Sequence, residues 1–181
     1  YGLGESGLIG RELAVKGAIE HYRKILIGKD PRQIGALWQE MYRSQYFEGG
    51  RVLTAAISAI DVALYDIVAK SLDIPVHQLL GSQHRDWVPC FTTCHTNMGP
   101  AAIKDVIQLM DEGWPSIRFI YGLPDIHSDP NVFEPRESIA LTAEWMVKIR
   151  DVVGSYTALG VEYHHRLSVA EAAAFSQKMP V

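Results

Sequence analysis

Hydrophobic and polar positions change their rhythm halfway along the chain. The second half alternates strand-like apolar runs with longer segments of helical spacing. The strand-like runs cover residues 87–94, 116–121 and 157–163, and the helical segments cover residues 101–112, 137–153 and a stretch opening at Ser168. Ser168-Val169-Ala170-Glu171 fits the capping-box pattern of a helix start. Repeated strand–helix order predicts parallel strands joined by right-handed crossovers.

The first half of the chain has a helical pattern. Helices are predicted at residues 11–26, from Asp30-Pro31 onward with Asp30 as N-cap and Pro31 at N1, and at residues 52–70. The alanines of the last segment permit close packing, and Asp61 and Asp66 within it are interpreted as hydrogen-bonded structural residues. No apolar run approaches the roughly 20 residues that a membrane helix requires, so no membrane partner is expected.

Two architectures fit the predicted strands, a doubly wound open sheet and a barrel. A G-x-G-x-x-G turn after the first strand would favour the open sheet, and the sequence has none. A whole barrel needs about 250 residues, and the segment from residue 86 has room for only part of one. Because a short parallel sheet leaves an unpaired edge, we expect the sequence to be truncated.

Composition narrows the class of protein. The 181 residues carry a formal net charge of −4, and 48% of them are hydrophobic, as in ordinary soluble domains. The mild acidity argues against a nucleic-acid surface, which needs clustered Lys and Arg. Cys90 and Cys94 are too few for a disulfide framework and predict reduced thiols in a cytoplasmic protein. With His95 they lack a second ligand pair at standard spacing, so zinc is not expected.

Two segments carry a family resemblance. Residues 55–67 (AAISAIDVALYDI), 74–81 (IPVHQLLG) and Arg85 resemble the end of the capping domain in the mandelate racemase/muconate lactonizing enzyme group of the enolase superfamily. Residues 163–168 (YHHRLS) resemble its acid-sugar dehydratase branch, near the mannonate and galactonate dehydratases.

The resemblance implies a fold and an activity. Residues 1–84 would form part of an α+β capping domain, and residues 85–181 the first three βα units of a modified TIM (β/α)₇β barrel, which is incomplete. The full-length parent would be a Mg²⁺-dependent lyase that removes the proton α to the carboxylate of a sugar acid and then expels a β-hydroxyl. The fragment alone is expected to be inactive, and the parent to be a homo-oligomer.

Barrel active sites gather at the C-terminal ends of strands, where Glu162 and His164 end the third predicted strand. The family has an Asp as its first metal ligand at this place, so the resemblance implies that Glu162 binds Mg²⁺, with two further ligands on later strands outside this chain. His164 lies two positions on and would point the same way on an extended strand. By resemblance it is the general acid or base, and imidazole chemistry suits that role.

Other candidates surround these two. By resemblance, Arg118 in the second strand assists the chemistry or binds substrate. Tyr121 is either a hydroxyl donor at the strand end or a packed aromatic, and Arg166 either binds the substrate carboxylate or forms a salt bridge. His95 and Asn97 follow the first strand and could bind substrate. Asp125, His127 and Asp129 are interpreted as part of a polar lid without a metal of its own.

Two alternatives stay open. A non-catalytic or truncated paralogue is favoured by Glu162 in place of Asp and by the missing later strands. A racemase or cycloisomerase of the same superfamily is the other, although the absence of a Lys-x-Lys motif at residues 118–121 argues against it.

Overall fold

The computed structural model describes residues 1–47, 49–123 and 133–180. It divides the chain into two compact units, Tyr1–Asp86 and Trp87–Val181, called unit 1 and unit 2 below.

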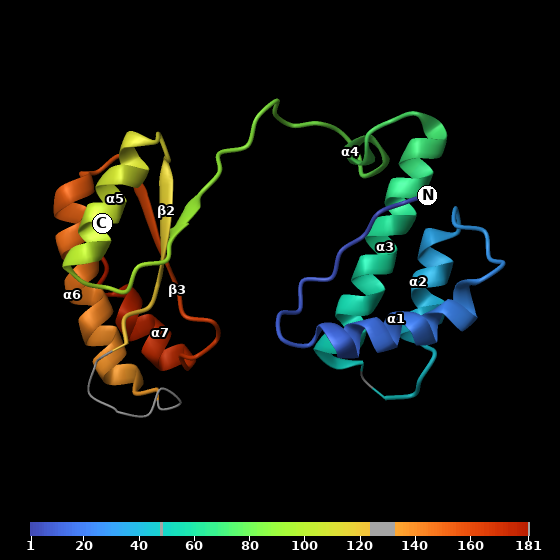
Figure 1. Cartoon of the computed structure of the whole chain (residues 1–181), viewed down its shortest axis with the longest axis horizontal. Helices are drawn as coiled ribbons and strands as arrows, with labels where there is room; N and C mark the ends of the chain where they lie inside the picture. The colour runs from blue at the N-terminus through green and yellow to red at the C-terminus, as the bar shows by residue number, and fades with distance from the viewer. Residues whose placement is uncertain (48, 124–132, 181) are drawn as a thin grey trace. The chain divides into compact units, whose positions relative to one another are not determined.

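Unit 1 is helical (Figure 1). Its helices are α1 (Glu12–Leu26), α2 (Ile34–Tyr42), α3 (Gly50–Leu72) and the short α4 (Val76–Leu79). They enclose a core of Val15, Ala18, Tyr22, Met41, Ala56 and Ile57. The first and third predicted helices are confirmed.

The predicted start of the second helix is wrong. Asp30 and Pro31 lie in a turn, and Gln33 precedes the first helical residue. The Asp30 carboxylate accepts hydrogen bonds from the backbone and the side chain of Arg32 at 2.8–3.1 Å. The Asp30 carboxylate therefore stabilises a local turn. A short side chain that is used in this way cannot also cap the helix.

By length and composition alone, α3 is long and apolar enough to cross a membrane, with a mean hydropathy of 1.8 in an 18-residue window. In unit 1 its buried residues are Ala56, Ile57, Ala59, Leu64 and Ala69. Helices α1 and α2 both contact it. These apolar residues therefore supply the central helix of the unit 1 core.

The N-terminal segment lies against α3 so closely that side chains do not fit. A Cβ atom at Gly2 would lie 2.1 Å from the carbonyl oxygen of Ala63, and one at Gly4 would lie 1.8 Å from that of Ala59. Such distances are far below van der Waals contact, so glycine is required at both positions. The N-terminal segment thus packs directly on the backbone of α3, in addition to the close helix packing of α3 with α1 and α2.

Asp66 fastens the same segment to α3. Its Oδ2 accepts a hydrogen bond from the backbone N–H of Leu3 at 2.8 Å and another from Lys70 Nζ at 2.6 Å. The hydrogen bond from Lys70 is the main cause that lowers the pKa of Asp66. The prediction of a hydrogen-bonded structural Asp66 is confirmed. At Asp61, in the same helix, burial raises the pKa of the carboxyl group.

Unit 2 is a parallel three-stranded sheet in the order β1-β2-β3. The strands alternate with helices, confirming the predicted strand–helix repeat (Figure 1). In chain order they are β1 (Thr92–Cys94), α5 (Pro100–Asp111), β2 (Ser116–Ile120), α6 (Pro135–Val153), β3 (Ala158–Glu162) and α7 (Val169–Ser176). The capping box that starts α7 is also confirmed: Ser168 Oγ accepts from the Glu171 N–H, and the Glu171 carboxylate accepts from the Ser168 N–H.

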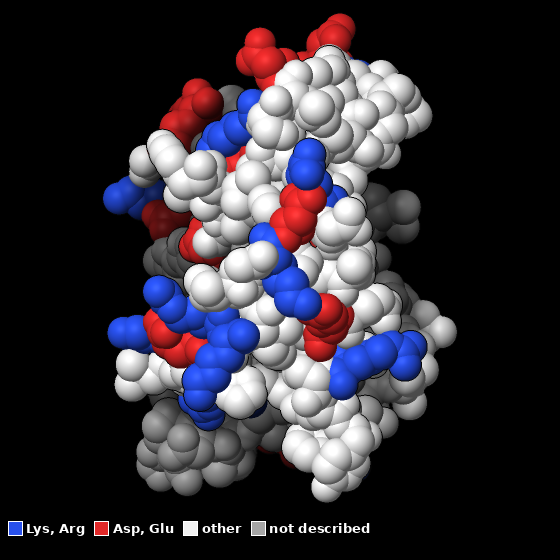
Figure 2. All heavy atoms as spheres, turned by 90° about the vertical axis from the view of Figure 1, so that its right-hand side faces the viewer, with Lys and Arg blue, Asp and Glu red and all other residues white. Residues whose placement is uncertain are grey.

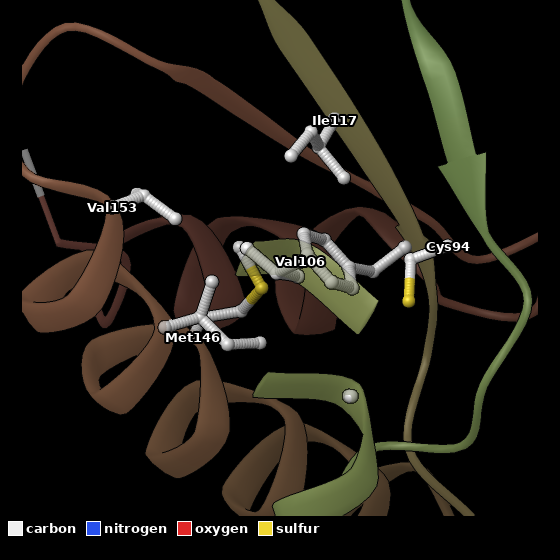
Figure 3. Packing of buried hydrophobic residues seen from close by; sticks show 8 residues of the cluster. Cys94, Val106, Ile117, Met146 and Val153 are labelled. Carbon is white, nitrogen blue, oxygen red and sulfur yellow. The ribbon is translucent and has the colours of Figure 1, made fainter. Parts of the chain in front are cut away.

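One face of the sheet packs on α5 and α6. Figure 3 shows the packing of the buried cluster that forms there. Its side chains come from β1, α5, β2 and α6: Cys94, Ala102, Val106, Ile117, Phe119, Met146, Ile149 and Val153. Ile117 and Phe119 are 0% and 1% exposed. Because side chains alternate along a strand, the residues between them must face the other way.

The first strand is shorter than predicted. In the described segment 87–94, pairing with β2 starts at Thr92, and Trp87 and Val88 are 72% and 70% exposed. Pro89 has no N–H to donate to a ladder, which shortens the segment able to pair.

A buried hydrogen-bond network fixes the ends of β2 and β3 to α6. Thr142 Oγ1 accepts from the Gly122 N–H at 2.8 Å and from the Tyr163 hydroxyl at 3.1 Å, and it donates to the Ser138 carbonyl at 2.6 Å. Ser138 Oγ donates to the Gly122 carbonyl at 2.6 Å. The Thr142 hydroxyl thus uses its one donor and both acceptor sites.

This network lies in a closely packed interior. Ser138 and Thr142 are fully buried, and a Cβ atom at Gly122 would lie 3.1 Å from Leu141 Cδ2. Burial raises the pKa of Tyr163. The residues just beyond β2 and at the end of β3 are therefore held by α6 as well as by sheet pairing.

Substitution of Gly4 by Ala should loosen the N-terminal segment, because the new methyl group overlaps the Ala59 carbonyl. We expect a loss of about 1–3 kcal/mol and faster hydrogen exchange of the Leu3 amide. Gly7→Ala is the matched control, since a Cβ atom there meets nothing within 4 Å. Equal melting temperatures and equal Leu3 exchange in the two variants would contradict the tight contact.

Substitution of Thr142 by Val should destabilise unit 2 by roughly 2–3 kcal/mol, because it leaves the Gly122 N–H and the Tyr163 hydroxyl buried without an acceptor. Tyr163→Phe removes one donor and leaves no acceptor buried alone, so its cost should be smaller. Thr54→Val, exposed on α3, controls for loss of a helix hydroxyl. Thermal unfolding should rank the losses in that order, and a Thr142→Val curve that overlays the control would rule out a stabilising network.

Candidate functional site

The candidate site lies on the sheet face opposite the helical layer. Arg118 is on this face of β2, between the buried Ile117 and Phe119. Sheet register pairs it with Thr93 of β1 and with Gly160 of β3. Glu162 lies two residues beyond Gly160, on the same side of β3. The parallel strands therefore bring residues far apart in sequence to one surface.

Three groups hold the Arg118 guanidinium. Its Nε and Nη2 donate to Thr93 Oγ1 at 3.2 and 3.0 Å. The Phe91 ring lies 4.8 Å from the guanidinium carbon, within the range of a cation–π interaction. Nη1 lies 3.6 Å from Glu162 Oε2, which is close enough for an ion pair and too long for a hydrogen bond.

Arg118 and Glu162, which the sequence gives as separate candidates, are thus brought together, with 38% and 35% of their side chains exposed. Such an ion pair is partly screened by water and stabilises the fold little. The arrangement suits binding better than folding, because a ligand can reach both charges.

The extended geometry expected between Glu162 and His164 is wrong. β3 ends at Glu162, and His164 and His165 have φ angles of 48° and 62°, in the left-handed region. The His164 N–H donates to Glu162 Oε1 at 3.0 Å, a bond that supports this turn. A left-handed conformation costs a non-glycine residue about 1–2 kcal/mol. Both histidines are exposed directly after the strand.

Tyr121 and Arg166 lie in an aromatic cluster on the helical side. Tyr121 stacks on Tyr163 with ring centroids 5.1 Å apart, and Phe133 meets it edge-on at 5.4 Å. The Arg166 guanidinium lies 5.8 Å from the Tyr121 ring and 5.4 Å from the Phe133 ring. Because odd-numbered residues of β2 face the helices, Tyr121 is on the other side of the sheet from Arg118.

His95 and Asn97 are exposed in the connection that follows β1. Thr96, between them, donates a short hydrogen bond to the Asp105 carboxylate of α5. This contact ties the connection to its helix and leaves the two neighbouring side chains at the same edge of the sheet as Glu162. Asp125, His127 and Asp129, which the sequence assigns to a lid, lie outside the described residues.

A divalent cation would find one carboxylate here. Glu162 offers the hard oxygen that Mg²⁺ prefers. Its two oxygens already face the His164 N–H and Arg118. Among residues 1–47, 49–123 and 133–180, no group of three or more His, Cys, Asp or Glu is placed to hold a metal ion. The described residues thus fit one ligand of a metal site and not a complete set.

Sequence reasoning missed Thr93 and Phe91. Both lie in the run predicted as the first strand, but nothing local reveals which residue of β2 stands opposite them. The parallel register that pairs Thr93 with Arg118 becomes visible only in the folded sheet.

Charges of both signs mix on one face of the molecule (Figure 2). Figure 2 shows Lys and Arg interspersed with Asp and Glu among the described residues of the face turned to the viewer. No concentrated positive field of the kind that attracts polyanions covers that face. The Arg118–Glu162 pair repeats this balance at the site, where one side chain can receive an organic anion and the other a cation.

Comparison with known proteins assigns the first part of the chain. Residues 1–81 match the N-terminal domain family of mandelate racemase/muconate lactonizing enzyme. A D-galactonate dehydratase family member, RspA, from Cellvibrio japonicus is 34% identical over 96% of this chain and 48% of its own length. A D-mannonate dehydratase from Novosphingobium aromaticivorans is 33% identical over the same shares.

The fold has equally clear relatives. The crystal structure of an enolase from Pantoea ananatis with bound D-gluconate and Mg superposes with a TM-score of 0.82 at 27% identity, over 97% of this chain and 49% of that one. The chain therefore spans about half the length of the proteins that it matches.

The structure and its relatives agree on the architecture. The helices and the parallel sheet match a capping domain and the start of an enolase-superfamily barrel, as the sequence predicted. Residues 1–81 belong to the N-terminal domain family of mandelate racemase/muconate lactonizing enzyme, and nearly the whole chain is similar to the relatives described above, which are sugar-acid dehydratases by name.

Proposed function

We propose that this chain is part of a lyase that dehydrates a sugar acid, with its substrate site on the sheet face that carries Arg118 and Glu162. The observation that carries the proposal is the 3.6 Å approach of these two side chains on neighbouring strands. Barrel enzymes bind substrate at the C-terminal ends of their strands, and Glu162 is the last residue of β3. Residues 1–84 would be part of the capping domain of the longer protein, and residues 85–181 part of its barrel domain.

The relatives give the substrate class. Two are named for D-galactonate and D-mannonate, and the enolase from Pantoea ananatis holds D-gluconate and Mg. Each of these compounds has a carboxylate, a proton on the adjacent carbon and a hydroxyl one carbon further on. Dehydration moves the α-proton to a base and expels the β-hydroxyl as water, which leaves an enol that becomes a 2-oxo acid.

The proposed roles follow from chemistry and position. Arg118 pairs with an oxyanion of the substrate, because a guanidinium gives planar, charge-assisted hydrogen bonds. His164, exposed just beyond β3, transfers the proton. Glu162 is one carboxylate ligand of a Mg²⁺ ion, which when bound stabilises negative charge on the substrate carboxylate. The ligand set is incomplete without oxygen donors beyond those described.

The remaining candidates take supporting roles in this proposal. His95 and Asn97 contact the polar end of the substrate from the β1 edge. Tyr121 and Arg166 interact with each other across 5.8 Å, so a substrate role requires them to leave the aromatic cluster. We further propose that the protein is cytoplasmic, in keeping with its two free cysteines. The longer protein would be a homo-oligomer, as the family resemblance implies.

A second candidate is a non-catalytic paralogue that keeps the fold. It is favoured by the pairing of Glu162 with Arg118, since the guanidinium takes the place beside the carboxylate where a cation would bind. Product analysis separates the candidates: a dehydratase yields a 2-oxo acid, a racemase or cycloisomerase an isomer of its substrate, and a non-catalytic protein neither.

Binding of D-gluconate to the 181-residue chain tests the proposed site. By calorimetry, Arg118→Lys should weaken binding about 10- to 100-fold, the range for loss of a charge-assisted bond. Glu162→Gln should abolish any tightening by Mg²⁺. Glu144→Gln, exposed on α6 and paired with Lys148, is the control for loss of a surface carboxylate. Unchanged affinity in the Arg118 variant would remove Arg118 from the site.

Turnover of D-galactonate and D-mannonate tests the role of His164, in a longer protein that joins this chain to the further half present in its relatives. His164→Asn should lower kcat by about 100-fold or more, because the proton transfer is lost. His165→Asn is matched to it in sequence, exposure and left-handed backbone, and it should keep most of the activity. The reverse ranking would assign the proton transfer to His165.

A further inference from the structure

Thr93 accepts two hydrogen bonds from Arg118. A guanidinium has five N–H donors, and the Nε and Nη2 hydrogens on its side edge both point to the single Thr93 hydroxyl oxygen. Two lone pairs on that oxygen match the two donors. The side edge of Arg118, the edge that would otherwise receive a carboxylate bidentately, is therefore taken by the protein itself.

The end edge of the guanidinium stays available. It carries one Nη1 hydrogen and the second Nη2 hydrogen, while the other Nη1 hydrogen points back beside Cδ. Nη1 is 3.6 Å from Glu162 Oε2, beyond hydrogen-bond length, so the ion pair does not saturate these donors. These donors can therefore bind a ligand oxygen without breaking a hydrogen bond within the described part of the chain.

The residue of β3 that lies opposite Arg118 has no side chain. Gly160 is the register partner of Arg118 on β3, and a Cβ atom there would meet nothing within 4 Å. The Phe91 ring centroid lies 4.8 Å from the guanidinium carbon and occupies the space on that side of Arg118. Thr93 and Phe91 therefore both contact Arg118 from the β1 side, which leaves its end edge toward β3.

We propose that Thr93 is a positioning residue that turns the end edge of Arg118 toward the β3 side of the sheet, beside Gly160 and Glu162, where it receives an oxyanion of the ligand. This inference rests on the proposed function, which supplies the sugar-acid carboxylate as that oxyanion. Thr93 acts through Arg118 and does not touch the ligand. An Arg side chain free of this hydroxyl would distribute its donors over several rotamers, at an entropic cost to binding.

Nitrogen-15 spectra of the arginine side chains in the 181-residue chain test the positioning directly. The Arg118 Nε–H signal is identified by its loss in Arg118→Lys. Thr93→Val, which keeps the branched shape, should shift this signal and speed its hydrogen exchange by about tenfold, the loss expected for one hydrogen bond. Thr93→Ser keeps the hydroxyl and should restore both. Thr92→Val removes the adjacent hydroxyl of β1 and should leave the signal unchanged.

Calorimetry with D-gluconate completes the test. Thr93→Val should weaken binding about tenfold, while Thr93→Ser and Thr92→Val bind as the unmodified chain does. If Arg118→Lys weakens binding but Thr93→Val changes neither affinity nor the Nε–H signal, the positioning role is overturned and the proposed function stands. If Arg118→Lys has no effect on binding, the proposed function fails and the positioning role falls with it.

Discussion

The hydroxyl of Thr142 is the constraint on which the rest of unit 2 depends. Three bonds saturate it, and they join the first residues after β2, the aromatic residue after β3 and the first turns of α6. Any other packing of α6 against the sheet would leave the Gly122 N–H or the Tyr163 hydroxyl buried without a hydrogen-bond acceptor. One side chain of α6 therefore fixes the ends of β2 and β3 relative to each other.

This network also determines the positions of the two charged residues of the candidate site. Tyr163 is held by the hydrogen bond of its hydroxyl and by stacking on Tyr121. Because Glu162 directly precedes Tyr163, its backbone is held in place as well. Arg118 meets it from β2, whose exit at Gly122 is tied to the same threonine. The aromatic cluster around Tyr121 and Arg166 thus supports the site from behind the sheet.

Sequence patterns were sufficient where structure is local. The helical periods of residues 101–112 and 137–153 and the capping box at Ser168 correspond closely to α5, α6 and the start of α7. Asp30 and the left-handed histidines could not be predicted this way, because a short side chain can serve a cap or a turn and His rarely adopts positive φ. Arg118 and Glu162 were identified singly, by resemblance, whereas Thr93 required the parallel register.

The central claim is that Arg118 and Glu162 act together on one ligand, and a double-mutant cycle tests it most directly. The cycle would measure D-gluconate affinity with Mg²⁺ for the unmodified chain, Arg118→Lys, Glu162→Gln and the double variant. Side chains that contact each other and share a ligand should couple by about 0.5–3 kcal/mol. Strictly additive losses would contradict a shared site and leave the ion pair as a surface contact of the sheet.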